Sequence, residues 1–221
     1  MREIIDRAGP LLLARTGATW EILWDGTFLM SSQCRASERA LGALARGQTL
    51  VAGLGMGFTL RAALDRPQVT SIDVVEIAAA VVDWNRGPLA ALADRPLDDP
   101  RVRVHVADLA RFLGQPHEAW DTILLDLDNG PSWIARPENA WLYQTGGLSR
   151  LRACLRAGGR LAIWLAQPEP ALLTRLRAHF AAVDSRAVAV TVGGRPSQDY
   201  ILVAACETQT DPSVVHVGTR D

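Results

Sequence analysis

The stretch Val51–Phe58, with the sequence VAGLGMGF, decides the fold of this chain of 221 residues. It joins the apolar run Thr49–Ala52 to three glycines at alternate positions and then to a segment with helical character. Glycines at the end of a strand let the backbone approach a nucleotide-like ligand, and the following helix offers its positive N-terminus. A dinucleotide fingerprint needs glycine where Phe58 stands, so the spacing suits a nucleoside without a pyrophosphate. A tight turn with a purely structural role remains the alternative.

Downstream of this stretch, short apolar runs alternate with helical segments, a pattern typical of βαβ units on a parallel sheet. We expect strands near residues 49–52, 69–75, 102–106, 122–125 and 160–165, and helices near 58–65, 77–93, 108–113, 145–157 and 169–180. Two further strands, near 183–192 and 199–205, are separated by Gly193-Gly194-Arg195-Pro196, which predicts a hairpin turn. The predicted fold class is α/β, with a doubly wound, seven-stranded Rossmann-like sheet that ends in an antiparallel hairpin.

Upstream of the glycines, residues 11–15 and 19–24 read as two short strands, and Asp25-Gly26 marks a tight turn after the second. A helix should follow, with Ser37 as its N-cap. We therefore divide the chain into a small N-terminal β-element (1–35), an α/β domain (36–206) that holds the ligand, and a polar tail (207–221).

The composition of the chain argues against several classes of function. The net charge is −1, which argues against a nucleic-acid binder with a broad basic face. All 23 basic residues are arginine, so Schiff-base chemistry, a lysine base and a Walker-type phosphate loop are excluded. The three cysteines and four histidines show no metal-ligand spacing, and we expect no metal site. No apolar run approaches the ~20 residues of a membrane span, and a cytoplasmic protein is expected.

Polar residues follow three of the predicted parallel strands, where ligands bind in open α/β sheets. Glu76 ends the second strand and can accept both hydroxyls of a ribose, although an acid at a helix start is the alternative. Asp108 follows the third strand and can meet an adenine amine, or serve only as a helix N-cap. Asp126 ends the fourth strand and can orient an amine nucleophile or take its proton.

The segment after the fourth strand is the other region with candidate residues. Asp128 and Asn129 begin a long loop that reaches Trp133 and Tyr143, and loops of this length are usually functional or mobile. We expect Asp128 to act with Asp126 on the acceptor, and Asn129, Trp133 and Tyr143 to contact it. Gln33 is a further candidate from above the sheet. The alternatives are a simple turn for Asp128-Asn129, a covered sheet edge for Trp133 and an exposed loop side chain for Gln33. The tryptophans on predicted strands, Trp24 and Trp164 among them, are expected in the core.

At these positions the sequence resembles the class I S-adenosylmethionine-dependent methyltransferase fold and, within it, the spermidine synthase-like branch. The resemblance covers roughly residues 20–205. The matching stretches are Ile22–Gly26, Gly53–Arg61, Asp73–Glu76, Asp99–Val102, Asp108, Asp121–Asp126 and Leu155–Leu161.

The resemblance implies a donor, either S-adenosylmethionine or its decarboxylated form, and a small-molecule acceptor. The residues that would hold the donor are Gly53, Gly55, Gly57, Glu76, Asp108 and Asp126. Asp126 matches the active-site aspartate of the family, which deprotonates the attacking amine. Neither nucleic acid nor a membrane is expected as a partner, and a homodimer is left open.

Departures from the branch's pattern shape the predicted reaction. Spermidine synthases usually have aspartate where this chain has Met56, and their tyrosine-histidine-glutamate cluster is replaced by Ser37-Glu38-Arg39. We therefore prefer methyl transfer to a small molecule, with transfer of an aminopropyl or related C3 unit as the alternative. Many methyltransferases have an acid where this chain has Val51. Because neither usual ligand of the donor's ammonium is present, a non-catalytic nucleoside-binding protein is a lesser alternative.

Overall fold

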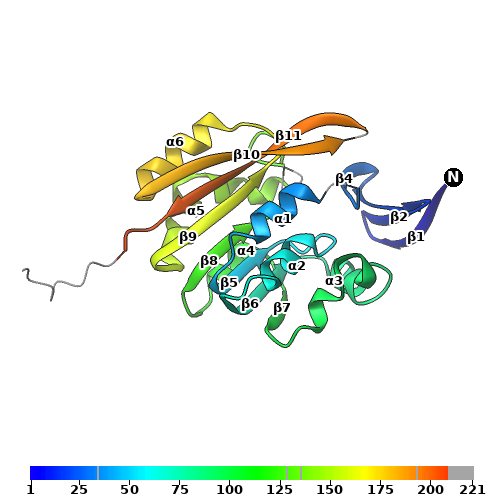
Figure 1. Cartoon of the computed structure of the whole chain (residues 1–221), viewed down its shortest axis with the longest axis horizontal. Helices are drawn as coiled ribbons and strands as arrows, with labels where there is room; N and C mark the ends of the chain where they lie inside the picture. The colour runs from blue at the N-terminus through cyan, green and yellow to red at the C-terminus, as the bar shows by residue number, and fades with distance from the viewer. Residues whose placement is uncertain (34, 128, 135, 193, 209–221) are drawn as a thin grey trace, which may run out of the picture.

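The computed structural model describes residues 1–33, 35–127, 129–134, 136–192 and 194–208, and in it the chain builds two β-sheets (Figure 1). The four-stranded sheet stands at one end of the molecule, and β11 leads the chain away at the opposite end (Figure 1). The boundaries predicted at residues 35 and 206 stay predictions.

The N-terminal sheet is an antiparallel meander of β1 (Arg2–Ala8), β2 (Leu11–Thr16), β3 (Thr19–Trp24) and β4 (Thr27–Ser31). Asp25 and Gly26, both at positive φ (44° and 76°), connect β3 to β4, which matches the predicted tight turn. The sequence pattern did not predict β1 and β4. In β1, charged residues interrupt the apolar ones, and the apolar run of β4 is only Phe28-Leu29-Met30, shorter than the run that identifies a buried strand.

The main sheet has seven strands in the order β10-β11-β9-β8-β5-β6-β7. Its parallel strands are β5 (Gly47–Ala52), β6 (Val69–Glu76), β7 (Val102–Val106), β8 (Trp120–Leu125) and β9 (Leu155–Leu165). The hairpin of β10 (Ala182–Val192) and β11 (Arg195–Ala205) completes the sheet at its other end, where β11 pairs antiparallel with β9. The predicted fold class is confirmed, and the order reverses direction at β5.

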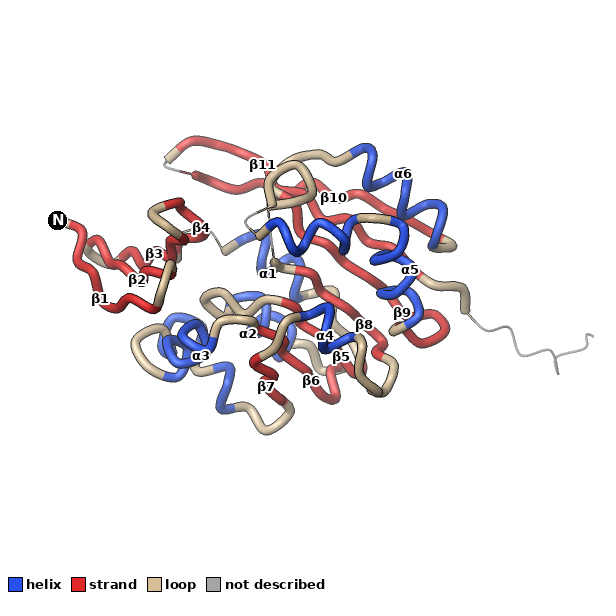
Figure 2. The backbone as a smooth tube through the Cα atoms, turned by 180° about the vertical axis from the view of Figure 1, so that it is seen from behind, coloured by secondary structure: helices blue, strands red, loops and turns tan. Residues whose placement is uncertain are grey.

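Helices cover both faces of the main sheet (Figure 2). The first face carries α1 (Ala36–Gly42), α2 (Phe58–Leu64) and α3 (Ala79–Arg86). The second carries α4 (Leu109–Leu113), α5 (Thr145–Ala153) and α6 (Pro170–His179). Side chains of β5 alternate between the two cores: Val51 packs on the first and Leu50 on the second.

The structure corrects three predicted elements. The helix predicted over 77–93 breaks after α3 at Gly87-Pro88, and a short 3-10 helix, η1 (Ala90–Ala93), follows. The helix predicted over 145–157 ends at Ala153, because β9 is longer than its apolar run and begins at Leu155. Ser37 is not the N-cap of α1; Arg35 stands there, and the Ser37 hydroxyl bonds Asp199 instead.

The register of the parallel strands brings their carboxyl ends level. Ala52 of β5 pairs with Val75 of β6 on one side and with Leu125 of β8 on the other. The next residues, Gly53, Glu76 and Asp126, therefore meet at one edge of the sheet. In the part of the chain that the structure describes, no helix has both the length and the apolar character needed to cross a bilayer.

Candidate nucleoside and acceptor site

A cavity of about 200 Å³ lies between this edge of the main sheet and the N-terminal sheet. The N-terminal sheet supplies an apolar wall made of Leu11, Ile22, Trp24, Leu29 and Met30. The main sheet supplies its glycine loop and the ends of β6, β7 and β8. Segments far apart in the sequence, from Leu11 of β2 to Trp164 of β9, thus line one cavity.

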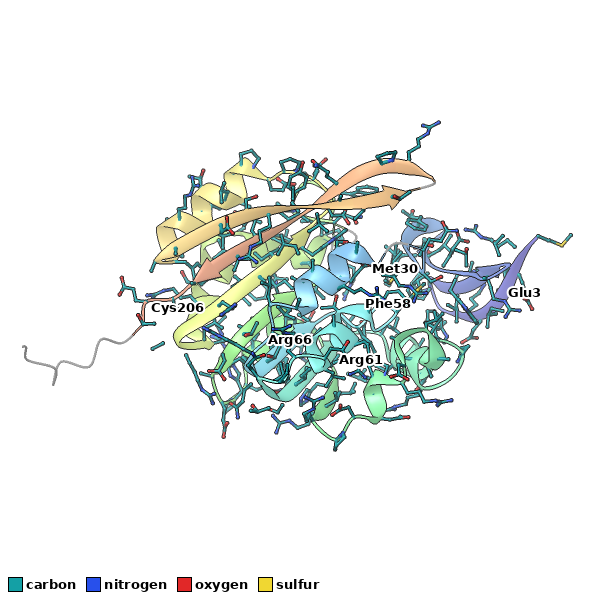
Figure 3. All side chains as sticks on the ribbon, viewed as in Figure 1. Glu3, Met30, Phe58, Arg61, Arg66 and Cys206 are labelled. Carbon is teal, nitrogen blue, oxygen red and sulfur yellow. The ribbon has the colours of Figure 1, made fainter. Side chains whose placement is uncertain are left out.

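The glycine loop forms one wall, and two of its three glycines reach the cavity. Gly53, at φ +90°, leaves no room for a side chain, because an added Cβ would stand 2.1 Å from the Asp126 carbonyl oxygen. Gly55 packs under Met30 of β4. Met30, labelled in Figure 3, packs against the first core, to which Phe58 at the start of α2 belongs. Gly57 does not line the cavity; it is the N-cap of α2 and packs against Asn85. A backbone cradle of this kind fits the predicted nucleoside donor.

Glu76 lines the cavity beside the glycine loop and is only 9% exposed. Its carboxylate accepts hydrogen bonds from the backbone N–H groups of Leu54 (3.0 Å) and Ala78 (2.9 Å). Each carboxylate oxygen keeps a second lone pair, so both can still accept a ribose hydroxyl. The carboxylate therefore fixes the glycine loop as well as presenting acceptors to a ligand.

Asp108 lines the same cavity from the start of α4. It is also the N-cap of that helix, since its Oδ1 accepts from the backbone N–H of Arg111 at 3.1 Å. The two roles that the sequence suggested for Asp108, a contact to adenine and a helix N-cap, are thus compatible. Its assignment to adenine stays a prediction.

Asp126 enters the cavity at the end of β8 and accepts a hydrogen bond from the Thr59 hydroxyl at 2.6 Å. Burial raises the pKa of Asp126 to about 6, and the Thr59 hydrogen bond opposes that rise. Glu38 of α1 lines the cavity nearby, and its pKa is raised to about 7 by burial and by the charge of Asp126. Asp199 of β11 lies behind them, hydrogen-bonded by Ser37 at 2.6 Å. We call Glu38, Asp126 and Asp199 the acidic cluster.

Among the described residues that were predicted to contact the acceptor, one lines the cavity. Asn129 lines the cavity, whereas Asp128 lies outside the described residues. The structure does not bring the other three to the cavity. Gln33 is exposed and donates a hydrogen bond to the Thr19 hydroxyl, Trp133 is 57% exposed, and Tyr143 is 2% exposed within the second core.

Some cavity residues were missed or misplaced by the sequence reasoning. Trp24 and Trp164, expected in the core, line the cavity. Both lie at or next to the end of their strands, and this position in the sequence could have indicated that they reach the cavity. Arg136 and Asn139 also line it from the loop after β8, and only the path of that loop could have shown this. The described residues contain no group of His, Cys, Asp or Glu side chains arranged to hold a metal ion.

This fold is that of a class I methyltransferase-like α/β protein, with a cavity at the carboxyl edge of its main sheet. The sequence model described as "Spermine/spermidine synthase domain" matches residues 45–193. The chain belongs to the spermine/spermidine synthase family.

Individual relatives agree with this membership. A polyamine aminopropyltransferase of Synechococcus sp. (strain JA-3-3Ab) is 32% identical over 159 residues, which are 66% of this chain and 49% of the relative. Putrescine N-methyltransferase 2 of Nicotiana attenuata is 33% identical over 124 residues, 53% of this chain and 32% of the relative. The spermidine synthase structure from Thermotoga maritima superposes with a TM-score of 0.73 at 15% identity, over 92% of this chain and 72% of that one. The chain spans about half the length of the curated relatives it matches.

The preference for methyl transfer is wrong. The family match and the aminopropyltransferase relative favour the aminopropyl alternative, and the N-methyltransferase relative covers less of both chains. The structure explains the error. Met56, whose missing carboxylate guided the preference, is fully buried and does not line the cavity. Glu38, in the Ser37-Glu38-Arg39 segment that also guided the preference, is a carboxylate that does line it, from α1.

Proposed function

We propose that this protein transfers a C3 unit, of the aminopropyl type, from an S-adenosyl sulfonium donor to an amine acceptor. The observation that carries the proposal is Asp126: a carboxylate held by Thr59 at the end of β8, inside the cavity and beside the glycine loop. Membership of the spermine/spermidine synthase family supports the same reaction. The relatives named above carry polyamine or putrescine in their names, which supports a di- or polyamine acceptor.

The donor would occupy the part of the cavity formed by the glycine loop. Gly53 and Gly55 give backbone contact, Glu76 would accept the ribose hydroxyls, and Asp108 would meet the adenine amine. The apolar wall from the N-terminal sheet, with Trp24, excludes water and can face the sulfonium by cation–π contact. The donor itself supplies an electrophilic carbon bonded to a positively charged sulfur.

The acidic cluster would serve the acceptor. Its carboxylates attract an ammonium group into the cavity, and Asp126 takes the proton that the amine must lose before it attacks. The amine nitrogen then bonds to the carbon next to sulfur, and the carbon–sulfur bond breaks with its electron pair going to sulfur. The products are the lengthened amine and 5′-methylthioadenosine. Holding the two substrates in line in a closed site supplies much of the rate.

The substitution Asp126→Asn tests the role of this carboxylate. Turnover should fall roughly 10²–10⁴-fold, the range for losing a general base, while donor affinity changes little. Turnover is measured as 5′-methylthioadenosine release, and donor affinity by calorimetry. Asp65→Asn, at the exposed residue that follows α2, is the matched control and should leave both unchanged. If Asp126→Asn abolishes donor binding while the residual complex turns over normally, Asp126 is a donor ligand and its role as base is refuted.

A further inference from the structure

Arg136 is the one basic side chain among the described residues that line the cavity. It stands in the loop after β8, immediately before the 3-10 helix η3 (Pro137–Tyr143). Its single ion pair in the described structure is to Glu138, with Nε and Oε2 3.8 Å apart, and Glu138 is 66% exposed. The Arg136 side chain as a whole is only 26% exposed. A mostly covered arginine side chain therefore has one distant, solvated ion-pair partner.

The acids of the cavity do not neutralise this charge. Over the described residues, none of Glu38, Glu76, Asp108 and Asp126 forms an ion pair with an arginine. An arginine on the wall of a site for a sulfonium and an ammonium repels both, so its presence needs another reason. A guanidinium presents parallel N–H donors whose spacing matches the two oxygens of a carboxylate.

We propose that Arg136 binds a carboxylate carried by one of the two substrates, so that the site takes an α-amino-acid group and not only amines. This rests on the proposed function, which it deepens. The carboxylate has two sources: a donor that has not been decarboxylated, which would pass on a 3-amino-3-carboxypropyl unit, or an amino acid as the acceptor. In both cases the carbon–nitrogen bond forms, the carbon–sulfur bond breaks and the amine's proton goes to Asp126. The carboxylate is bound by Arg136 and is unchanged by the reaction.

Two matched substrate pairs test this, because the members of each differ only in a carboxylate. The donors are S-adenosylmethionine and decarboxylated S-adenosylmethionine, and the acceptors are ornithine and putrescine. All four combinations are assayed by 5′-methylthioadenosine release, with wild type, Arg136→Gln and, as a matched control, Arg39→Gln on the exposed side of α1.

In one pair, Arg136→Gln should raise the KM of the carboxylate-bearing member roughly 10- to 100-fold, the value of a charge-assisted hydrogen bond. The KM of its carboxylate-free counterpart should stay within about twofold, and kcat at saturation should hold. Arg39→Gln should change neither. The substrate pair that shows this rise in KM identifies whether the donor or the acceptor carries the carboxylate that Arg136 binds. Equal effects of Arg136→Gln on both members of both pairs would overturn the proposal, as would a wild type that uses only decarboxylated donor with putrescine.

Failure of the proposed function gives a different result. If no combination releases 5′-methylthioadenosine, C3 transfer is refuted. Calorimetric titration of the same four compounds into wild type and Arg136→Gln then still decides the carboxylate proposal. Weaker binding of S-adenosylmethionine or ornithine to Arg136→Gln, with unchanged binding of its counterpart, supports it; no difference between the two proteins overturns it.

Discussion

The Thr59–Asp126 hydrogen bond controls the proton chemistry of the cavity. Burial favours the neutral carboxyl, and the hydroxyl of Thr59, 2.6 Å away, favours the carboxylate. The balance places the pKa of Asp126 at about 6, close to the pH at which a general base works well. Thr59 is fully buried on α2, so the packing of that helix holds the hydroxyl in position.

This balance predicts the pH dependence of activity. Because Asp126 must be ionised to accept a proton, kcat/KM should fall as the pH drops through about 6. Thr59→Val keeps the shape of the side chain but removes the hydroxyl that bonds Asp126. The pKa of Asp126 then rises, and the acid limb of the pH–rate profile should move to higher pH. Thr59→Ser should restore the wild-type limb. A pH–rate profile of the three proteins measures this, and an acid limb in Thr59→Val at the wild-type position would contradict it.

The sequence predicted the residues that stand directly at strand ends and missed those placed by the path of a loop. Glu76 and Asp126 could be predicted to share an edge, because each ends a strand in a sheet of known direction. Arg136 could not be placed, because the loop that carries it has no periodic pattern. Tyr143 was expected at the cavity, yet its chain segment turns into the second core.

At the scale of elements, a polar network centred on the buried Asp73 joins three strands of the main sheet. Asp73 of β6 is 8% exposed and accepts hydrogen bonds from Arg103 and Trp120, at 3.0 Å each, and pairs with His105 at 2.8 Å. Burial raises the pKa of Asp73, but these partners outweigh it and the net pKa is lowered. The network ties β7, which has no strand on its outer side, to β6 and β8.

Asp73→Ala should cost about 1–3 kcal/mol in the free energy of unfolding, because it leaves the buried indole N–H of Trp120 unpaired. Since the folded pKa is below the unfolded value, this contribution is present above pH ~4 and is lost as the pH falls through the lowered pKa. Urea denaturation at several pH values measures it. Asp184→Ala, which removes an exposed ion pair on β10, should cost under about 0.5 kcal/mol. Equal costs for the two variants at neutral pH would contradict this account of the network.

Elements with strong apolar patterns were predicted well, and the exceptions have local causes. The five parallel strands and the closing hairpin contain their predicted apolar runs, although β9 and β11 begin several residues earlier. In β1, charged residues interrupt the apolar ones, so its sequence shows no strand pattern. The break after α3 follows Gly87-Pro88, where proline removes a helical hydrogen bond.

At the scale of the whole molecule, the N-terminal sheet has no catalytic group of its own among its cavity residues, which are all apolar. It contributes by covering the carboxyl edge of the main sheet, where Met30 packs against the glycine loop. In the proposed reaction, a dry wall on one side and the acidic cluster on the other would strengthen the electrostatic interactions that bring the sulfonium and the amine together. The pairing of the two sheets around one cavity could not be predicted from either segment's pattern alone.

The identity of the product nucleoside tests the central claim most directly. The full chain is incubated with putrescine and with S-adenosylmethionine or its decarboxylated form, and the products are identified by mass spectrometry, with Asp126→Asn as the control. The account predicts 5′-methylthioadenosine and an amine lengthened by a C3 unit, both greatly reduced in Asp126→Asn. Formation of S-adenosylhomocysteine with a methylated amine, and no 5′-methylthioadenosine, would contradict it.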